Sequence, residues 1–176
     1  MKFFFNMITV LMAVLFVSAC NSVKTGAVND RVPEAALCQQ VKQIVNQHKN
    51  GFEQIKGQIQ LTKNMDIWEA KYQLVGKNCQ IWHWSNGKQV YMCSLTVPDK
   101  ETADIKINNA ISFTKKCLGK KWKHENIQRN NSESSRNIFS KQDEKTVASI
   151  HGVNTKGLFR SEWTVYYFIG DRDKTL

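Results

Sequence analysis

The sequence lacks the short motifs that carry the most common catalytic chemistries. It has no Gly-x-Ser-x-Gly elbow, no His-Glu-x-x-His zinc motif, no phosphate-binding glycine loop and no dinucleotide fingerprint. No motif therefore identifies the chain as a hydrolase, a metalloprotease or a nucleotide-dependent enzyme. We expect no cofactor. These absences do not exclude a catalytic group assembled by folding, because a triad is defined by geometry and not by chain order.

Histidine and cysteine are scarce and widely spaced. The histidines lie far apart in the chain, so each is expected to be structural or solvent-exposed rather than catalytic: His48, His83, His124 and His151. No pair of cysteines has the close ligand spacing of a zinc site, so we predict no metal site.

The sequence also lacks an apolar run long enough to cross a bilayer. The run Phe3–Val17 is shorter than the roughly 20 residues that a membrane-spanning helix needs, and Asn6 interrupts it. A positive charge at Lys2, a short apolar centre and small residues after it are typical of a signal peptide.

The segment Val17-Ser18-Ala19-Cys20 ends this apolar stretch. It resembles the lipobox of bacterial lipoproteins, in which a diacylglycerol is attached to the cysteine and the preceding segment is removed. The resemblance covers residues 1–20 only, and it implies that Cys20 is the lipidated first residue of the mature chain. In that family Asp after the cysteine favours the inner membrane, so Asn21 favours the outer membrane, with the protein facing the periplasm. An ordinary secretory signal would not need this cysteine.

The chain divides into three predicted segments. Residues 1–19 are the signal peptide, residues 20–32 are the lipidated cysteine with a polar, flexible tether, and residues 33–176 form one globular domain. The domain shows no internal repeat with strong self-similarity and no low-complexity block.

Four cysteines remain after Cys20, namely Cys38, Cys79, Cys93 and Cys117. An even number in an exported protein predicts two disulfides, because the periplasm is oxidising. The pairing that we favour joins Cys79 to Cys93 and Cys38 to Cys117. The rival pairing joins Cys38 to Cys79 and Cys93 to Cys117.

The favoured pairing depends on a predicted β-hairpin. Two runs rich in aromatic and β-branched residues flank Ser85-Asn86-Gly87. If these three residues form the loop, with Gly87 in the left-handed conformation, Cys79 lies opposite Cys93 and can bridge it. A two-residue turn at Asn86-Gly87 would instead point the two cysteines to opposite sides.

The periodicities predict an α+β domain with two helices. One helix begins near Pro33 and stops at Asn50-Gly51, and the other is capped by Asp99 and ends at Gly119. Strands are expected at 67–74, 79–84, 88–96, 137–142, 145–151 and 162–170, with a mobile polar loop at 124–136. The expected architecture is an antiparallel sheet of about six strands with both helices packed on it.

A cluster of lysines around Trp122 is the first candidate binding surface: Lys115, Lys116, Lys120, Lys121 and Lys123. Their field would attract an acidic protein or anionic lipid headgroups beside the anchor. The alternative is that these cations stabilise a helix end and keep the surface soluble. Nucleic acid would satisfy the same electrostatics, but the periplasm excludes it as a partner.

The hairpin supplies the second candidate, Trp82 and Trp84. With a three-residue loop, both share one side with Lys88, while Ile81 and His83 share the other. Either both sides are buried, or the two tryptophans form an exposed aromatic patch of the kind that marks an interaction site.

Three function classes follow. The first is a non-enzymatic, lipid-anchored envelope protein that binds through its basic and aromatic surface. The second is an immunity lipoprotein that neutralises a toxin delivered into the periplasm. The third is an envelope hydrolase, which requires a cleft where histidine and acidic side chains converge.

Overall fold

The computed structural model describes residues 33–128, 135–156 and 161–175, so the predicted signal peptide and tether lie outside the described residues. The first half of the domain contains α2 (Glu34–His48), a short 3-10 helix (Glu53–Ile55), β1 (Lys56–Leu61), β2 (Met65–Ala70), β3 (Asn78–Trp84) and β4 (Gln89–Val97). The second half contains α3 (Lys100–Leu118), β5 (Lys123–Gln128), β6 (Ser135–Ser140), β7 (Thr146–Lys156), β8 (Ser161–Asp171) and α4 (Arg172–Thr175).

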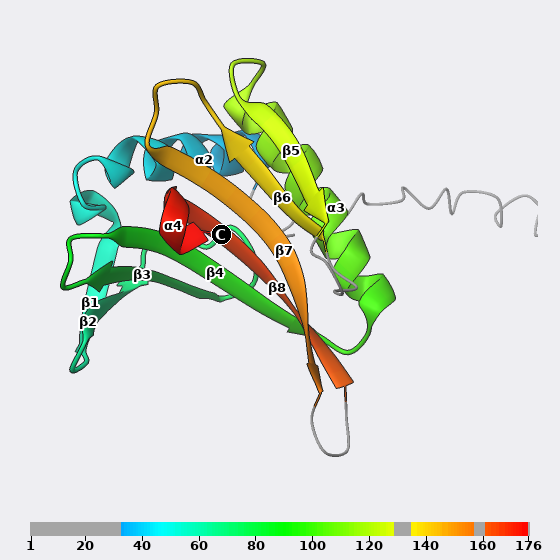
Figure 1. Ribbon diagram of the computed structural model, residues 1–176, viewed down its shortest axis with the longest axis horizontal. Helices are drawn as coiled ribbons and strands as arrows, with labels where there is room; N and C mark the ends of the chain where they lie inside the picture. Colours follow the sequence, from blue (N-terminus) through cyan, green and yellow to red (C-terminus); the bar gives the residue numbers. More distant parts are fainter. Residues whose placement is uncertain (1–32, 129–134, 157–160, 176) are drawn as a thin grey trace, which may run out of the picture.

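The strands form one antiparallel sheet in the order β1-β2-β3-β4-β8-β7-β6-β5. Each half of the chain runs from a long helix into four consecutive antiparallel strands, and the two halves join where β4 pairs with β8 (Figure 1). The arrangement of elements is therefore repeated, although the sequence shows no strong repeat. A single antiparallel sheet with both long helices on it confirms the predicted α+β class.

Within the described residues the sheet has eight strands, where about six were predicted. The two strands that sequence patterning missed, β1 and β5, are the edges of the sheet. Edge strands have one unpaired side, and most side chains of KGQIQL and KHENIQ are exposed, so hydrophobic alternation is weak in both. The predicted mobile loop at 124–136 is wrong at both ends, because His124–Gln128 belongs to β5 and residues 135–136 begin β6. Its middle, 129–134, lies outside the described residues.

Both long helices have the predicted limits. Pro33 precedes the first residue of α2. At the start of α3 the Asp99 carboxylate accepts a hydrogen bond from the Thr102 amide at 2.7 Å, and this bond holds the pKa of Asp99 below its usual value. Gly119 ends α3 with a φ of 75°, a conformation that glycine adopts without a steric cost.

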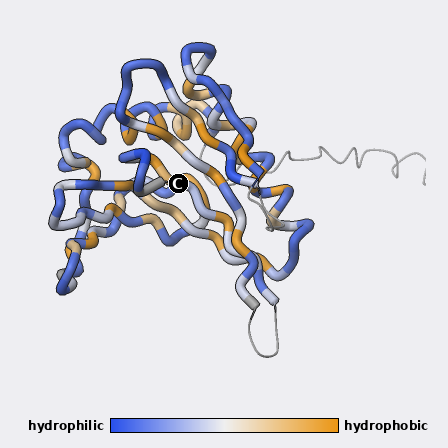
Figure 2. The backbone as a smooth tube through the Cα atoms, in the orientation of Figure 1, coloured by the Kyte–Doolittle hydropathy of each residue, from blue (hydrophilic) through white to orange (hydrophobic). Residues whose placement is uncertain are grey.

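The core lies between the sheet and the two long helices. Apolar residues of the central strands alternate toward α2 and α3, and Figure 2 shows the hydrophobic segments in these strands and along the helices, with polar residues at the turns. The core includes Leu37, Val41 and Ile44 from α2, and Tyr91, Cys93, Val165, Tyr167 and Ile169 from β4 and β8. Within the described residues, no helix combines the length and hydrophobicity needed to cross a membrane.

Two disulfides tie these layers together. Cys38 on α2 is bonded to Cys117 on α3, and Cys79 on β3 is bonded to Cys93 on β4. Cys79 and Cys93 are register partners. The loop between them has the predicted three-residue form, because the Trp84 amide donates to the Lys88 carbonyl and Gly87 has a φ of 80°. The favoured pairing is confirmed and its rival is wrong.

Candidate functional site

The side of the sheet turned away from α2 and α3 is the candidate binding surface, called here the open face. Residues that alternate with the core positions occupy it, and neither long helix covers it; both lie behind the sheet in Figure 1. The short helix α4 contacts β4, β7 and β8 and lies in front of the sheet near the end of β8 (Figure 1).

The strand register places the side chains of the open face in rows across the sheet. The first row contains Ile67, Trp82, Val90, Gly170 and Val147. The second row contains Gln80, Met92, Phe168, Ser149 and Ile138. The third row contains Ser94, Tyr166, His151 and Arg136. The aromatic members of these rows remain partly exposed, as do Ile67 and Ser94. The other aliphatic and small members are buried, namely Val90, Met92, Ile138, Val147, Ser149 and Gly170.

Five aromatic side chains form two groups on this face, together called the open-face cluster. Trp82 and Trp84 meet edge to face with their ring centroids 5.9 Å apart. Tyr166 and Phe168 stack at 5.7 Å, and His151 stacks on Phe168 at 5.4 Å. β4 separates the two groups, so the strands that carry Trp82 and Phe168, β3 and β8, lie about 10 Å apart, two strand spacings.

Trp82 and Trp84 thus occupy the side predicted for them, and both are half-buried. The helix-facing side of the hairpin is largely buried, with Ile81 in the core. Tyr166, Phe168 and His151 were not among the predicted binding residues. The alternation within β8 places Tyr166 and Phe168 on the same side of the strand. Nothing in the sequence indicates whether that side faces the helices or the open face.

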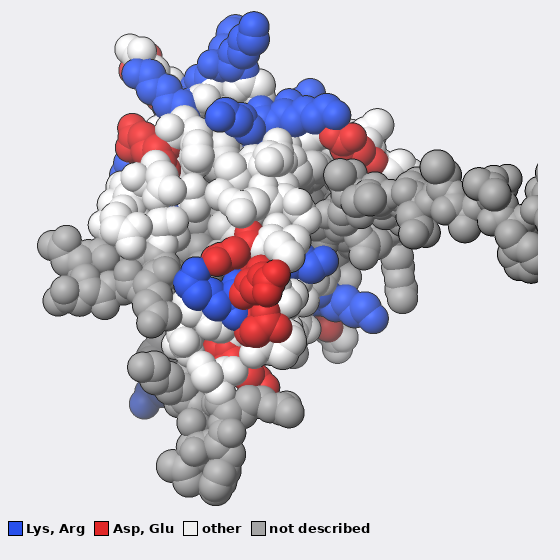
Figure 3. All heavy atoms as spheres, turned by 90° about the vertical axis from the view of Figure 1, so that its right-hand side faces the viewer, with Lys and Arg blue, Asp and Glu red and all other residues white. Residues whose placement is uncertain are grey.

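The predicted lysines form a separate surface, called here the lysine patch. It consists of Lys115, Lys116, Lys120, Lys121 and Lys123, all exposed. Figure 3 shows Lys and Arg side chains gathered at the top of the molecule, where α3 runs into β5. Trp122 is half-buried and packs against the core, so it contributes to the packing of the domain rather than standing free among the lysines. β5 is one edge of the sheet and β3 belongs to the other half, so the basic and aromatic candidates do not form one surface.

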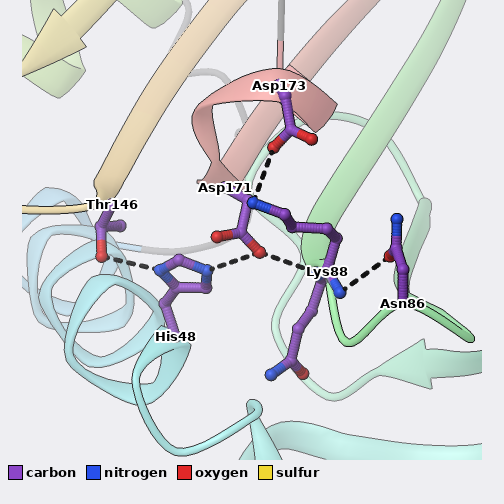
Figure 4. A network of polar contacts seen from close by, with 7 residues as sticks. His48, Asn86, Lys88, Thr146, Asp171 and Asp173 are labelled. Atoms are coloured by element: carbon purple, nitrogen blue, oxygen red, sulfur yellow. Dashed lines mark hydrogen bonds and ion pairs between the residues drawn. The ribbon is translucent and has the colours of Figure 1, made fainter.

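A network around His48 is the assembly that most resembles catalytic chemistry (Figure 4). Its Nδ1 lies 2.8 Å from Thr146 Oγ1, and its Nε2 lies 3.5 Å from Asp171 Oδ2. Asp171 also accepts a hydrogen bond from the Gln89 amide at 2.9 Å. Lys88, on the neighbouring turn, lies 3.5 Å from Asp173.

This network is closed to substrate. His48 is 7% exposed and Thr146 is 5% exposed. A surface hollow lined by Lys88, Lys145, Asp171 and Arg172 reaches the carboxylate but neither the imidazole nor the hydroxyl. A nucleophilic hydroxyl must be accessible to a reacting carbonyl or phosphoryl group. The contacts instead attach the end of α2 to β7 and β8.

The other histidines lie in three separate environments. His83 stacks with Trp68, His124 stacks with Phe139 at 4.6 Å and contacts the Asn137 side chain at 3.0 Å, and His151 belongs to the open-face cluster. Among the described residues, no three His, Cys, Asp or Glu side chains converge in a way that could hold a metal ion.

Comparison with protein-family models, with curated proteins and with solved structures finds no match to this chain. The function of this chain is therefore inferred from the geometry of its own surfaces.

Proposed function

We propose that the chain is a lipid-anchored protein of the bacterial outer membrane that faces the periplasm and binds another protein through the open face of its sheet, without catalysis. The observation that carries this proposal is the open-face cluster: five aromatic side chains, partly exposed, on the side of the sheet turned away from both long helices. The lipobox-type segment ending at Cys20 supports the anchor and the compartment.

The size of the face suits a protein partner. Eight strands about 4.8 Å apart, with a mean length of about eight residues at 3.3 Å per residue, give the whole face roughly 900 Å², of which α4 covers the part near the end of β8. A specific protein complex buries about this area on each partner. Tryptophan and tyrosine are also enriched among the residues that dominate binding energy, because they bury large areas with few rotatable bonds.

The scaffold favours binding because its platform is already ordered. The central strands β3, β4 and β8 are paired along their length, and one disulfide bridges β3 to β4. A partner that docks on such a surface costs little conformational entropy in this chain. An immunity lipoprotein is a more specific version of the same proposal, in which the partner is a toxin delivered into the periplasm.

The test is recovery of partners from intact envelopes with the full, lipidated chain. We expect the double substitution Trp84→Ala/Tyr166→Ala to weaken capture by at least about 30-fold, since each residue is expected to contribute at least 1 kcal/mol. The measurement is quantitative pull-down after mild cross-linking, with thermal unfolding to show that the variant is folded.

The matched control is Ile105→Ala, which removes a side chain that is 52% exposed on α3. This variant should recover the same partners as the unsubstituted protein. Equal recovery with the Trp84/Tyr166 double variant would contradict the proposed docking face.

A further inference from the structure

The lysine patch lies at the same end of the domain as the point where the predicted tether joins it. The described chain begins at Pro33, one residue before α2. The start of α2 is fixed beside the end of α3 by the Cys38–Cys117 disulfide, whose Cα atoms are 4.8 Å apart. An ion pair between Lys116 Nζ and Glu34 Oε1 at 2.5 Å adds a second link.

From this placement we propose that the lysine patch rests on the anionic phospholipid headgroups of the membrane that holds the anchor. The inference relies on the lipid attachment that is part of the proposed function. It adds a second contact and an orientation to that function. The occupant is a bilayer surface, and an acidic protein is the alternative that the test must separate from it.

Stabilisation of the helix end does not account for the whole patch. Lys115 and Lys116 lie in the last turn of α3, where cations interact favourably with the helix dipole. Lys120, Lys121 and Lys123 lie beyond Gly119, in the turn and at the start of β5. The dipole effect falls off within the last turn, so these three charges need another explanation.

Most lysines of the patch also form no ion pair with an acidic side chain of the described residues. Within the described residues, the ion pairs include Lys116 with Glu34 but none formed by Lys115, Lys120, Lys121 or Lys123. Near an anionic membrane each such charge strengthens adsorption about fivefold. Four of them together are enough to orient a domain that is already held nearby.

The predicted tether has the right length for this contact. Residues 20–32 reach at most about 45 Å when fully extended. The attraction acts over about 8 to 10 Å at physiological salt, so it requires the domain to touch the surface, which the tether permits. In Figure 1 the turn between α3 and β5, which carries the patch, lies at the top, while the open face is turned toward the viewer. Adsorption through the patch therefore leaves the open face accessible to a protein.

The experiment uses the mature chain with Cys20→Ser, which has no lipid. Flotation is measured with vesicles of phosphatidylglycerol and phosphatidylcholine in equal parts, and with vesicles of phosphatidylcholine alone. We expect binding to the anionic vesicles that weakens steeply with added salt. The triple substitution Lys120→Glu/Lys121→Glu/Lys123→Glu should weaken it by about 100-fold or more.

The matched control is Lys63→Glu/Lys71→Glu/Lys77→Glu, which makes the same change in net charge at the opposite edge of the sheet, around β1 to β3. It should weaken vesicle binding by less than about tenfold. Equal losses in both triple variants would show that only net charge matters and would overturn the proposal.

Absence of vesicle binding by the Cys20→Ser chain would also overturn the proposal. If the patch variant then lost a protein in the envelope pull-down, the partner would be an acidic protein. Neither result bears on the anchor, because this chain carries none. Mass spectrometry of Cys20 in the native protein tests the anchor separately.

Discussion

Removal of the Cys38–Cys117 disulfide by Cys38→Ala/Cys117→Ala is expected to lower the free energy of unfolding by about 4.5 kcal/mol, because the bond closes a loop with a sequence separation of 79. A cross-link of this length removes a large part of the entropy of the unfolded chain. It also joins the first helix of one half to the first helix of the other. The measurement is equilibrium unfolding in guanidinium chloride.

The second disulfide is the internal control for this effect. Cys79→Ala/Cys93→Ala opens a loop with a separation of 14, and the same entropy argument gives a loss of about 3 kcal/mol. The variant that lacks the Cys38–Cys117 bond should therefore have a lower free energy of unfolding than the variant that lacks the Cys79–Cys93 bond. An equal loss, or a larger loss for the hairpin bond, would show that local packing around the sulfurs outweighs chain entropy.

The helices and one hairpin could be predicted because their signals are local. The limits of α3 follow from Asp99 at one end and Gly119 at the other, and each acts on the backbone within a few residues. The loop closed by Gly87 fixes the register of its two strands, and this register places Cys79 opposite Cys93. Local chemistry was therefore sufficient to choose one disulfide pairing among three.

The edge strands could not be predicted, because their neighbours determine them. β5 has the sequence KHENIQ, in which five of the six side chains are polar or charged, so it shows no apolar alternation. It is a strand because β6 pairs with it along its whole length. The repeated order of a helix and four strands could not be predicted either. The same backbone arrangement can form twice from different side chains, so it leaves no repeat in the sequence.

The candidate site was predicted in part. The loop placed Trp82 and Trp84 on the same side of the hairpin. Tyr166 and Phe168 join that side only because β4 pairs with β8, which is a contact between residues more than 70 positions apart in the chain. The separation of the lysine patch from the tryptophans also depends on strand order, which no local pattern in this sequence specifies.

Two buried tyrosines are expected to make the fold unstable in alkali. Tyr91 and Tyr167 are fully buried, and burial raises the pKa of both hydroxyls well above the ordinary value near 10. The Tyr91 hydroxyl accepts from the Leu74 amide at 3.3 Å and donates to the Tyr72 carbonyl at 3.0 Å. Both hydroxyls therefore keep their protons in the folded state.

The sign of the effect follows from the proton balance. Below pH 10 both states hold these protons and the tyrosines cause no pH dependence. Above pH 10 the unfolded chain releases them and the folded chain does not, so stability falls as the pH rises. Each tyrosine lowers the free energy of unfolding by up to about 1.4 kcal/mol per pH unit, which gives about 2.7 kcal/mol per unit for the pair.

Alkaline unfolding at constant ionic strength measures this slope above pH 10. Tyr167→Phe should reduce the tyrosine contribution by about half, and adding Tyr91→Phe should remove it. The Thr114 hydroxyl, which lies 2.8 Å from the Tyr167 hydroxyl, can bond to its own helix in the variant, so the fold should survive at neutral pH. Other groups that titrate in alkali are present in every variant and cancel in the comparison. Identical slopes in the unsubstituted protein and the double variant would show that these hydroxyls do not link folding to pH.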